Sequence, residues 1–144
     1  MTEPLVGVGM GSPSDWETMQ HCAAQLEALG VPFETRALSA HRTPRELSAW
    51  IEDAESRGVE VFIAAAGMAA ALPGVGAAQT TRTVLGVPME TKISGGLDSL
   101  LSMVQMPGGI PVGILAVGRA GAVKAAILAP QILGGSRPES EEAV

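Results

Sequence analysis

Several features are scarce or missing in this chain of 144 residues, and each absence excludes a class of protein. The single cysteine, Cys22, cannot form an intramolecular disulfide or a metal site of several thiolates. Nine Lys and Arg face fifteen Asp and Glu, and no basic cluster occurs. We therefore expect no nucleic-acid partner, because neutralising phosphates needs grouped cations. No apolar run reaches the roughly 18 residues of a membrane-spanning helix, so we expect no membrane partner either.

The beginning of the chain and its aromatic content narrow the picture further. The first residues lack the basic region of a signal peptide, and with the lone thiol this predicts a cytoplasmic protein. Tyrosine is absent, and there are two Trp and two Phe. Apolar residues nevertheless make up 47 %, so small residues must fill the core of one ordinary domain. Helices rich in Ala and Gly can be covered on several sides, which favours a homo-oligomer.

Short apolar runs alternate with segments of helical spacing throughout the chain. The expected strands are residues 5–10, 33–38, 59–66, 87–90 and 111–117. The expected helices are 14–29, 44–57, 75–83, 97–106 and 118–133. This alternation predicts an α/β fold in three layers, a doubly wound parallel sheet of the flavodoxin-like kind. We expect one domain over residues 1–134 and a flexible acidic C-terminal tail over 135–144.

Ligands of such sheets bind beyond the carboxyl ends of the strands, where the first loop carries Ser12, Ser14 and Asp15. Free backbone N–H groups and two hydroxyls could hold a phosphate there, and Asp15 could accept hydrogen bonds from ribose hydroxyls. The alternative is a capped helix without a ligand, since Ser and Asp are common at helix starts. The pattern is neither G-x-G-x-x-G nor a Walker loop.

The second loop, Ser39-Ala40-His41-Arg42-Thr43-Pro44, places a hydroxyl, an imidazole and a guanidinium within four residues. His41 is the candidate for proton transfer, since an imidazole titrates near neutral pH. Arg42 suits a phosphate, whose oxygens match its planar fork. A surface histidine and a helix-start arginine remain the alternative. The third loop, 67–74, is nearly free of large side chains, so either a flat ligand approaches its backbone or it is a tight turn.

Together these loops resemble the PurE family, the N5-carboxyaminoimidazole ribonucleotide mutases of purine synthesis. The matching motifs are residues 10–15, 39–44, 66–67 with 72–74, 97–100 with 104–107, and 118–122. The resemblance implies an octamer with its sites at subunit contacts and a ribonucleotide substrate. It implies no cofactor and no metal, with carbon dioxide released and recaptured inside the pocket.

The resemblance also implies roles for individual residues. The phosphate would contact Ser12, Ser14, Ser39 and Arg42, and the ribose would contact Asp15. The imidazole and its carboxylate would lie against Ala40, Ala66 and Gly67, with Ala71 and Leu72 as further substrate contacts. His41 would move the proton between nitrogen and carbon as general acid and base.

Two positions depart from the family pattern. The family usually has a second histidine where this chain has Ala71, and an asparagine where it has Lys124. The loss of a protonatable wall keeps two alternatives open beside the mutase. One is a divergent paralogue that carboxylates or decarboxylates the same or a related nucleotide, and the other is a nucleotide-binding protein without turnover.

Overall fold

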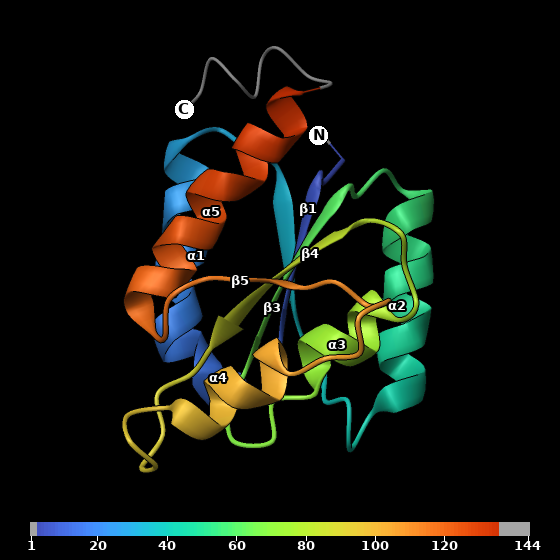
Figure 1. The fold of residues 1–144 in the computed structure, drawn as a ribbon. Coiled ribbons are helices and arrows are strands. Elements are labelled where there is room, and N and C mark those ends of the chain that lie inside the picture. The colour runs from blue at the N-terminus through green and yellow to red at the C-terminus, as the bar shows by residue number, and fades with distance from the viewer. Residues whose placement is uncertain (1–2, 136–144) are drawn as a thin grey trace.

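A computed structural model describes residues 3–135 and shows one sheet covered by helices on both faces (Figure 1). All five strands are parallel and lie in the order β2-β1-β3-β4-β5. The strands are β1 (Val6–Met10), β2 (Phe33–Ala37), β3 (Val61–Ala66), β4 (Thr83–Pro88) and β5 (Gly113–Ile114). The helices are η1 (Pro13–Asp15), α1 (Trp16–Ala28), α2 (Pro44–Ser56), α3 (Leu72–Ala77), α4 (Leu97–Val104) and α5 (Arg119–Gly134). The predicted three-layer, flavodoxin-like fold is confirmed.

The order of the strands reverses between β1 and β3. From β1 the chain moves outward to β2, and it then returns across β1 to form β3 on the other side. All residues of β1 and β3 are buried, as expected for strands covered on both faces. The loops that leave β1 and β3 therefore turn to opposite faces and open a crevice between them, which is where doubly wound sheets bind ligands.

Two hydrophobic cores, one on each face of the sheet, join the sheet to its helices. The face under α1 and α5 packs Met19 and Leu26 against valines of β1 and alanines of α5. On the other face, α2 lays Trp50 directly on β1. A Cβ at Gly7 would lie 3.0 Å from the Trp50 ring, and one at Gly9 would lie 3.2 Å from it. Although the sequence has few large side chains, the core on this face is filled because the Trp50 indole packs closely against the glycines of β1.

The structure differs from the expected elements in the second half of the chain. The predicted helix 75–83 is wrong, because α3 starts at Leu72 and ends at Ala77. Pro73 in its first turn explains the early start, since proline fits there without losing a hydrogen bond. Strand β4 begins at Thr83, four residues before the predicted 87–90, because residues 83–88 pair in register with all of β3. Only residues 113–114 of the predicted strand 111–117 pair with β4.

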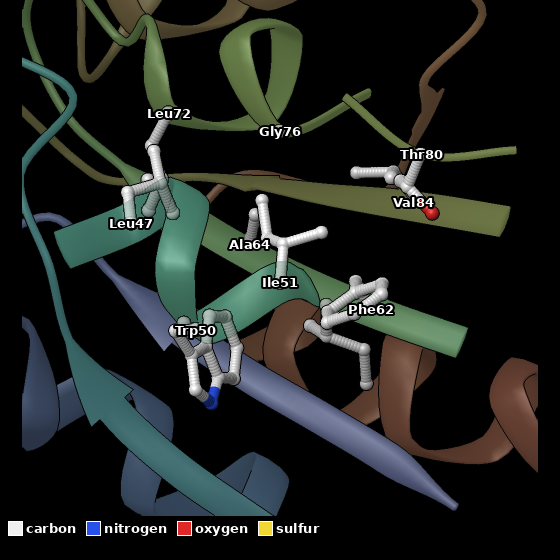
Figure 2. A pocket seen from close by; sticks show the side chains of 11 residues that line it. Leu47, Trp50, Ile51, Phe62, Ala64, Leu72, Gly76, Thr80 and Val84 are labelled. Atoms are coloured by element: carbon white, nitrogen blue, oxygen red, sulfur yellow. The ribbon is translucent and has the colours of Figure 1, made fainter. Parts of the chain in front are cut away.

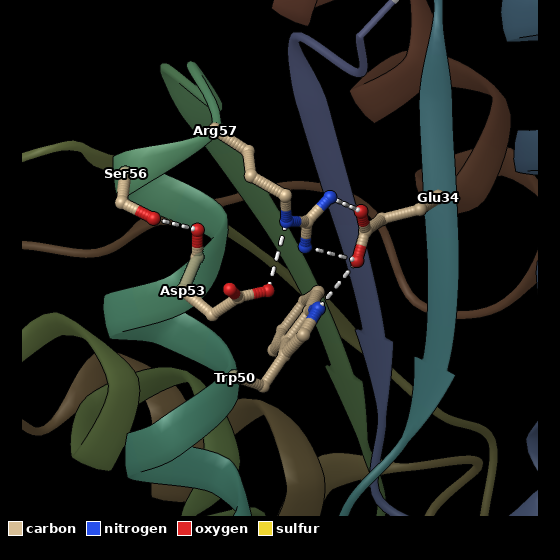
Figure 3. Close-up of polar contacts among 5 residues, drawn as sticks. All are labelled: Glu34, Trp50, Asp53, Ser56 and Arg57. Carbon is tan, nitrogen blue, oxygen red and sulfur yellow. Dashed lines mark hydrogen bonds and ion pairs between the residues drawn. The ribbon is translucent and has the colours of Figure 1, made fainter.

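An ion-pair cluster joins edge strand β2 to helix α2 (Figure 3). The Arg57 guanidinium donates to both carboxylate oxygens of Glu34, and Trp50 Nε1 donates to Glu34 Oε2 at 2.8 Å. Arg57 Nε also donates to Asp53 Oδ2 at 2.8 Å. The hydrogen bonds from Arg57, more than burial, set the Glu34 carboxyl pKa below its usual value. The cluster therefore ties together β2 and α2, the two elements on either side of residues 38–43.

Two remaining expectations concern the ends and the surface of the chain. No helix within residues 3–135 is long and apolar enough to cross a bilayer. The predicted acidic tail falls outside the described residues apart from Gly135.

Candidate functional site

The loops that follow β1, β2, β3 and β4 enclose one polar cavity of about 330 Å³. It contains every residue that the sequence singled out: Ser12, Ser14, Asp15, Ser39, Ala40, His41, Arg42, Ala66, Gly67, Ala71 and Leu72. The other lining residues are Gly11, Met68, Ala69, Met89, Glu90 and Thr91. A second void between α2, α3 and the sheet is apolar and measures only about 20 Å³, too little for a substrate (Figure 2).

The first loop is shaped by the hydroxyl of Ser12. Ser12 Oγ accepts a hydrogen bond from the Ser14 backbone N–H at 3.3 Å and lies 2.9 Å from Ser14 Oγ. This caps η1, which runs directly into α1, so the predicted helix cap is present. Within the Ser12–Ser14 pair one hydroxyl proton is shared, and the other is available to an anion in the cavity.

The second loop is held by Ser39 and Thr43. Ser39 Oγ accepts hydrogen bonds from the backbone N–H groups of His41 at 3.2 Å and Arg42 at 3.0 Å. Thr43 Oγ1 accepts from the Ser39 N–H at 2.8 Å. The Ser39 oxygen is thereby occupied as an acceptor while its proton stays available as a donor. The Arg42 guanidinium is exposed and forms no ion pair within residues 3–135.

A contact of the His41 ring indicates which of its two nitrogens carries the hydrogen. Its Nε2 lies 3.1 Å from the backbone oxygen of Ala69. A carbonyl oxygen accepts and never donates, so Nε2 carries a hydrogen in this contact. The neutral ring then keeps its lone pair on Nδ1, which is the basic atom. The contact crosses from the second loop to the third and makes the imidazole part of the cavity wall.

The third loop brings backbone close to the cavity. A Cβ at Gly67 would lie 3.3 Å from the Met89 Cβ, so glycine permits the close approach of the loop after β4. Met68 has φ of 58°, a left-handed conformation that is rare for side chains other than glycine. Ala71 is half-buried and presents only a methyl group. At the position where the PurE resemblance predicts a second histidine, the cavity wall therefore carries only this methyl group.

Asp15 is the half-buried acid of the cavity. Burial raises the pKa of its carboxyl, and a hydrogen bond with the Ser12 backbone offsets part of that rise. The ionised carboxylate therefore loses part of its hydration in the cavity. A ligand rich in hydroxyl groups would donate hydrogen bonds that replace the lost water. No group of three or more His, Cys, Asp or Glu that could hold a metal occurs within residues 3–135.

Three residues after β4, Met89, Glu90 and Thr91, were missed by the sequence reasoning. Once β4 is known to end at Pro88, these three residues are expected in the site, because residues that follow a parallel strand enter the crevice. Lys124, one of the departures from the family pattern, is exposed on α5 and is not among the residues that line the cavity. Residues 118–121, the N-cap and first turn of α5, do not line the cavity either.

Sheet order, buried central strands and a polar cavity at the point of reversal define a flavodoxin-like α/β protein with a candidate ligand site. A family model described as AIR carboxylase matches residues 5–144, and the chain belongs to this family. It is 56 % identical over 140 residues to the N5-carboxyaminoimidazole ribonucleotide mutase of Pseudomonas aeruginosa, covering 97 % of this chain and 86 % of that protein. The predicted PurE resemblance is confirmed.

Two further relatives agree with this assignment. The N5-carboxyaminoimidazole ribonucleotide mutase of Bacillus subtilis is 56 % identical over 131 residues, which is 91 % of this chain and 81 % of that protein. The crystal structure of Treponema denticola PurE superposes with a TM-score of 0.88 at 26 % identity, covering 97 % of this chain and 86 % of that one. Sequence and fold therefore lead to the same family.

Proposed function

We propose that this protein is an isomerase of purine biosynthesis that converts N5-carboxyaminoimidazole ribonucleotide into the C4-carboxylated isomer. The observation that carries the proposal is the cavity in which an oriented imidazole, three serine hydroxyls, an exposed guanidinium and a half-buried carboxylate meet. Relatives that bear this enzyme's name match over nearly the whole chain. The substrate is a small nucleotide, and the reaction uses no metal or cofactor.

The anionic end of the substrate is bound by the first two loops. Arg42 offers the phosphate two parallel hydrogen bonds and a full positive charge. Ser12, Ser14 and Ser39 add hydroxyl protons that the protein itself leaves available. Asp15 accepts from the ribose hydroxyls. These contacts hold the aminoimidazole toward Ala40, Ala66 and Gly67, where only small groups line the wall.

The chemistry then needs one proton to change place. The bond from the exocyclic nitrogen to the carboxylate carbon breaks, its electron pair stays on nitrogen, and nitrogen gains a proton. Ring carbon C4 attacks the carbon dioxide so released, and loses its hydrogen as a proton. His41 takes up and returns that proton through Nδ1, since Nε2 is engaged with Ala69. Such general acid and base catalysis is worth roughly 10²–10⁴-fold.

Ala71 favours a second candidate function. With a methyl in place of a histidine, one wall of the carbon dioxide pocket lacks a hydrogen-bond donor. A paralogue that exchanges carbon dioxide with solvent would carboxylate or decarboxylate the nucleotide instead of retaining the original carboxylate.

Labelled bicarbonate separates the candidates. The purified protein is given unlabelled N5-carboxyaminoimidazole ribonucleotide in the presence of labelled bicarbonate. Retention of the unlabelled carboxylate on C4 supports the mutase, whereas label on C4 or net loss of carboxylate supports the paralogue. Binding of the nucleotide without any reaction would refute both and leave a binding protein. Ala71→His should raise the mutase rate if the missing side chain limits retention.

His41→Asn tests the proton carrier. We expect loss of turnover with nucleotide affinity kept within about tenfold, since the phosphate and ribose contacts remain. His21→Asn, the same change at the histidine of α1, is the matched control and should keep full turnover. Unchanged turnover in His41→Asn would remove the imidazole from the mechanism.

The proposal extends to assembly and location. An exposed apolar stripe on α4, formed by Leu97, Leu101 and Val104, is consistent with cover from another subunit. We propose a homo-octamer in the cytoplasm. Light scattering should give a mass of about eight times the 14.7 kDa of the chain, and a monomeric mass would refute the assembly.

A further inference from the structure

Ser99 lies in the first turn of α4 and is completely buried. Its Oγ accepts a hydrogen bond from the backbone N–H of Met68 at 3.0 Å, across 31 residues of sequence. Ser99 is the third residue of α4, whose N-cap is Gly96, so its hydroxyl does not cap the helix and instead holds the loop after β3.

This hydrogen bond holds the backbone of Met68, whose conformation is unusual. Its φ of 58° costs about 1–2 kcal/mol in a residue other than glycine. Its side chain is 69 % exposed, so burial of that side chain does not compensate. The hydroxyl oxygen of Ser102, one turn after Ser99, lies 3.2 Å from the Met68 carbonyl oxygen, but it lies closer, at 2.7 Å, to the Asp98 carbonyl oxygen, which accepts its single hydrogen. Strain of this kind persists when surrounding contacts hold it, and the buried Ser99 hydroxyl of α4 holds the backbone of this residue.

The held residue orients the next carbonyl. Ala69 O accepts from the Ala71 N–H at 2.8 Å and from His41 Nε2–H at 3.1 Å. The direction of this carbonyl depends on the left-handed turn at Met68. A continuous series of contacts therefore runs from Ser99, through the backbone of residues 68–69, to the imidazole.

We propose that Ser99 is a positioning residue for His41. By anchoring Met68 it aims the Ala69 carbonyl at Nε2, which selects the tautomer with its basic lone pair on Nδ1. Ser99 contacts neither substrate nor reacting atoms. The catalytic consequence rests on the proposed function of His41, whereas the effect on the tautomer does not.

The test combines spectroscopy of the free protein with kinetics. The chain has two histidines, so nitrogen-15 spectra of the labelled imidazoles resolve His41 from His21, and His21→Asn assigns them. In the wild type we expect the neutral His41 ring to carry its hydrogen on Nε2. Ser99→Ala should move it toward a mixture of both tautomers. It should also lower kcat about tenfold with KM changed less than threefold, equivalent to one hydrogen bond at about 1.4 kcal/mol.

Two further variants keep the test decisive. Ser99→Cys preserves volume with a weaker acceptor, so its spectrum and kcat should lie between wild type and Ser99→Ala, and it serves if the alanine variant does not fold. Ser56→Ala is a change of the same kind on the exposed side of α2, and it should leave the His41 tautomer and kcat unchanged.

The outcomes distinguish this proposal from the proposed function. An unchanged His41 tautomer in both Ser99 variants overturns the positioning role. A changed tautomer with wild-type kcat overturns its catalytic consequence. If the wild type itself shows no turnover, the proposed function fails, and the spectra alone still decide whether Ser99 orients His41.

Discussion

Glu34 links the edge strand β2 to α2, and its replacement by alanine tests how much that link contributes to the stability of the fold. The change removes both oxygens that receive Arg57 and the one that receives Trp50 Nε1 (Figure 3). It leaves the indole N–H of Trp50, a residue only 5 % exposed, without its acceptor.

The expected cost follows from burial. A stranded buried donor costs about 1–3 kcal/mol. The ion pair itself adds less, because the side chains of Arg57 and Glu34 are 31 % and 23 % exposed and solvent screens them. Together we expect Glu34→Ala to lower the free energy of unfolding by about 2–3 kcal/mol. Glu34→Gln, which keeps one acceptor oxygen, should cost about half as much.

The pH dependence gives an independent check. The Glu34 pKa is lowered in the folded protein, chiefly by hydrogen bonds from Arg57, so the charged form is stabilised on folding. That stability is fully present above the unfolded pKa, near the ordinary 4.5, and is lost as pH falls through the folded pKa. The difference between wild type and Glu34→Ala should therefore be largest near neutral pH and shrink in acid.

Urea unfolding at neutral and acidic pH measures both quantities. Asp53→Ala is the control, since its pair with Arg57 lies at the surface with the carboxylate 63 % exposed, and it should cost about 0.5 kcal/mol or less. A cost for Glu34→Ala no larger than that of the control, or one that grows in acid, would refute this account of the cluster.

Three further changes have defined outcomes. Asp15→Asn should raise stability at neutral pH and lose that advantage below the ordinary pKa of 3.8, because burial raises the Asp15 pKa; urea titrations at both pH values decide. Met68→Gly should raise the free energy of unfolding by about 0.5–1 kcal/mol, because relief of left-handed strain exceeds the entropy cost of glycine. A lower melting temperature than that of the wild type would contradict this. Gly121→Ala should cost about 3 kcal/mol or more in thermal unfolding, since a Cβ would lie 1.7 Å from the Ala116 carbonyl oxygen; a wild-type melting temperature would count against it.

Much of the site could be predicted because its residues follow strands directly. Ser12 and His41 lie in loops at the carboxyl ends of β1 and β2, which local apolar runs identify without any tertiary information. The sequence places the loop after β4 at 91–97, but the true start of this loop could not be predicted in this way, since β4 ends at Pro88 and the predicted strand ends at residue 90. Gly86 inside the strand and Pro88 at its end weaken the local pattern, and β4 is defined by its pairing with β3. Glu90 was missed as a result.

The sequence by itself determined the alternation of strands and helices, and the loops that carry the hydroxyls, His41 and Arg42, because these depend on neighbours along the chain. The tertiary structure decided which loops meet, since the sheet order places the ends of β1 and β3 side by side. It also decided which distant groups meet, as in the contact of His41 with the Ala69 carbonyl 28 residues away and that of Met68 with Ser99 31 residues away. Hydrogen bonds between distant loops depend on the packing of whole elements, which no local pattern records.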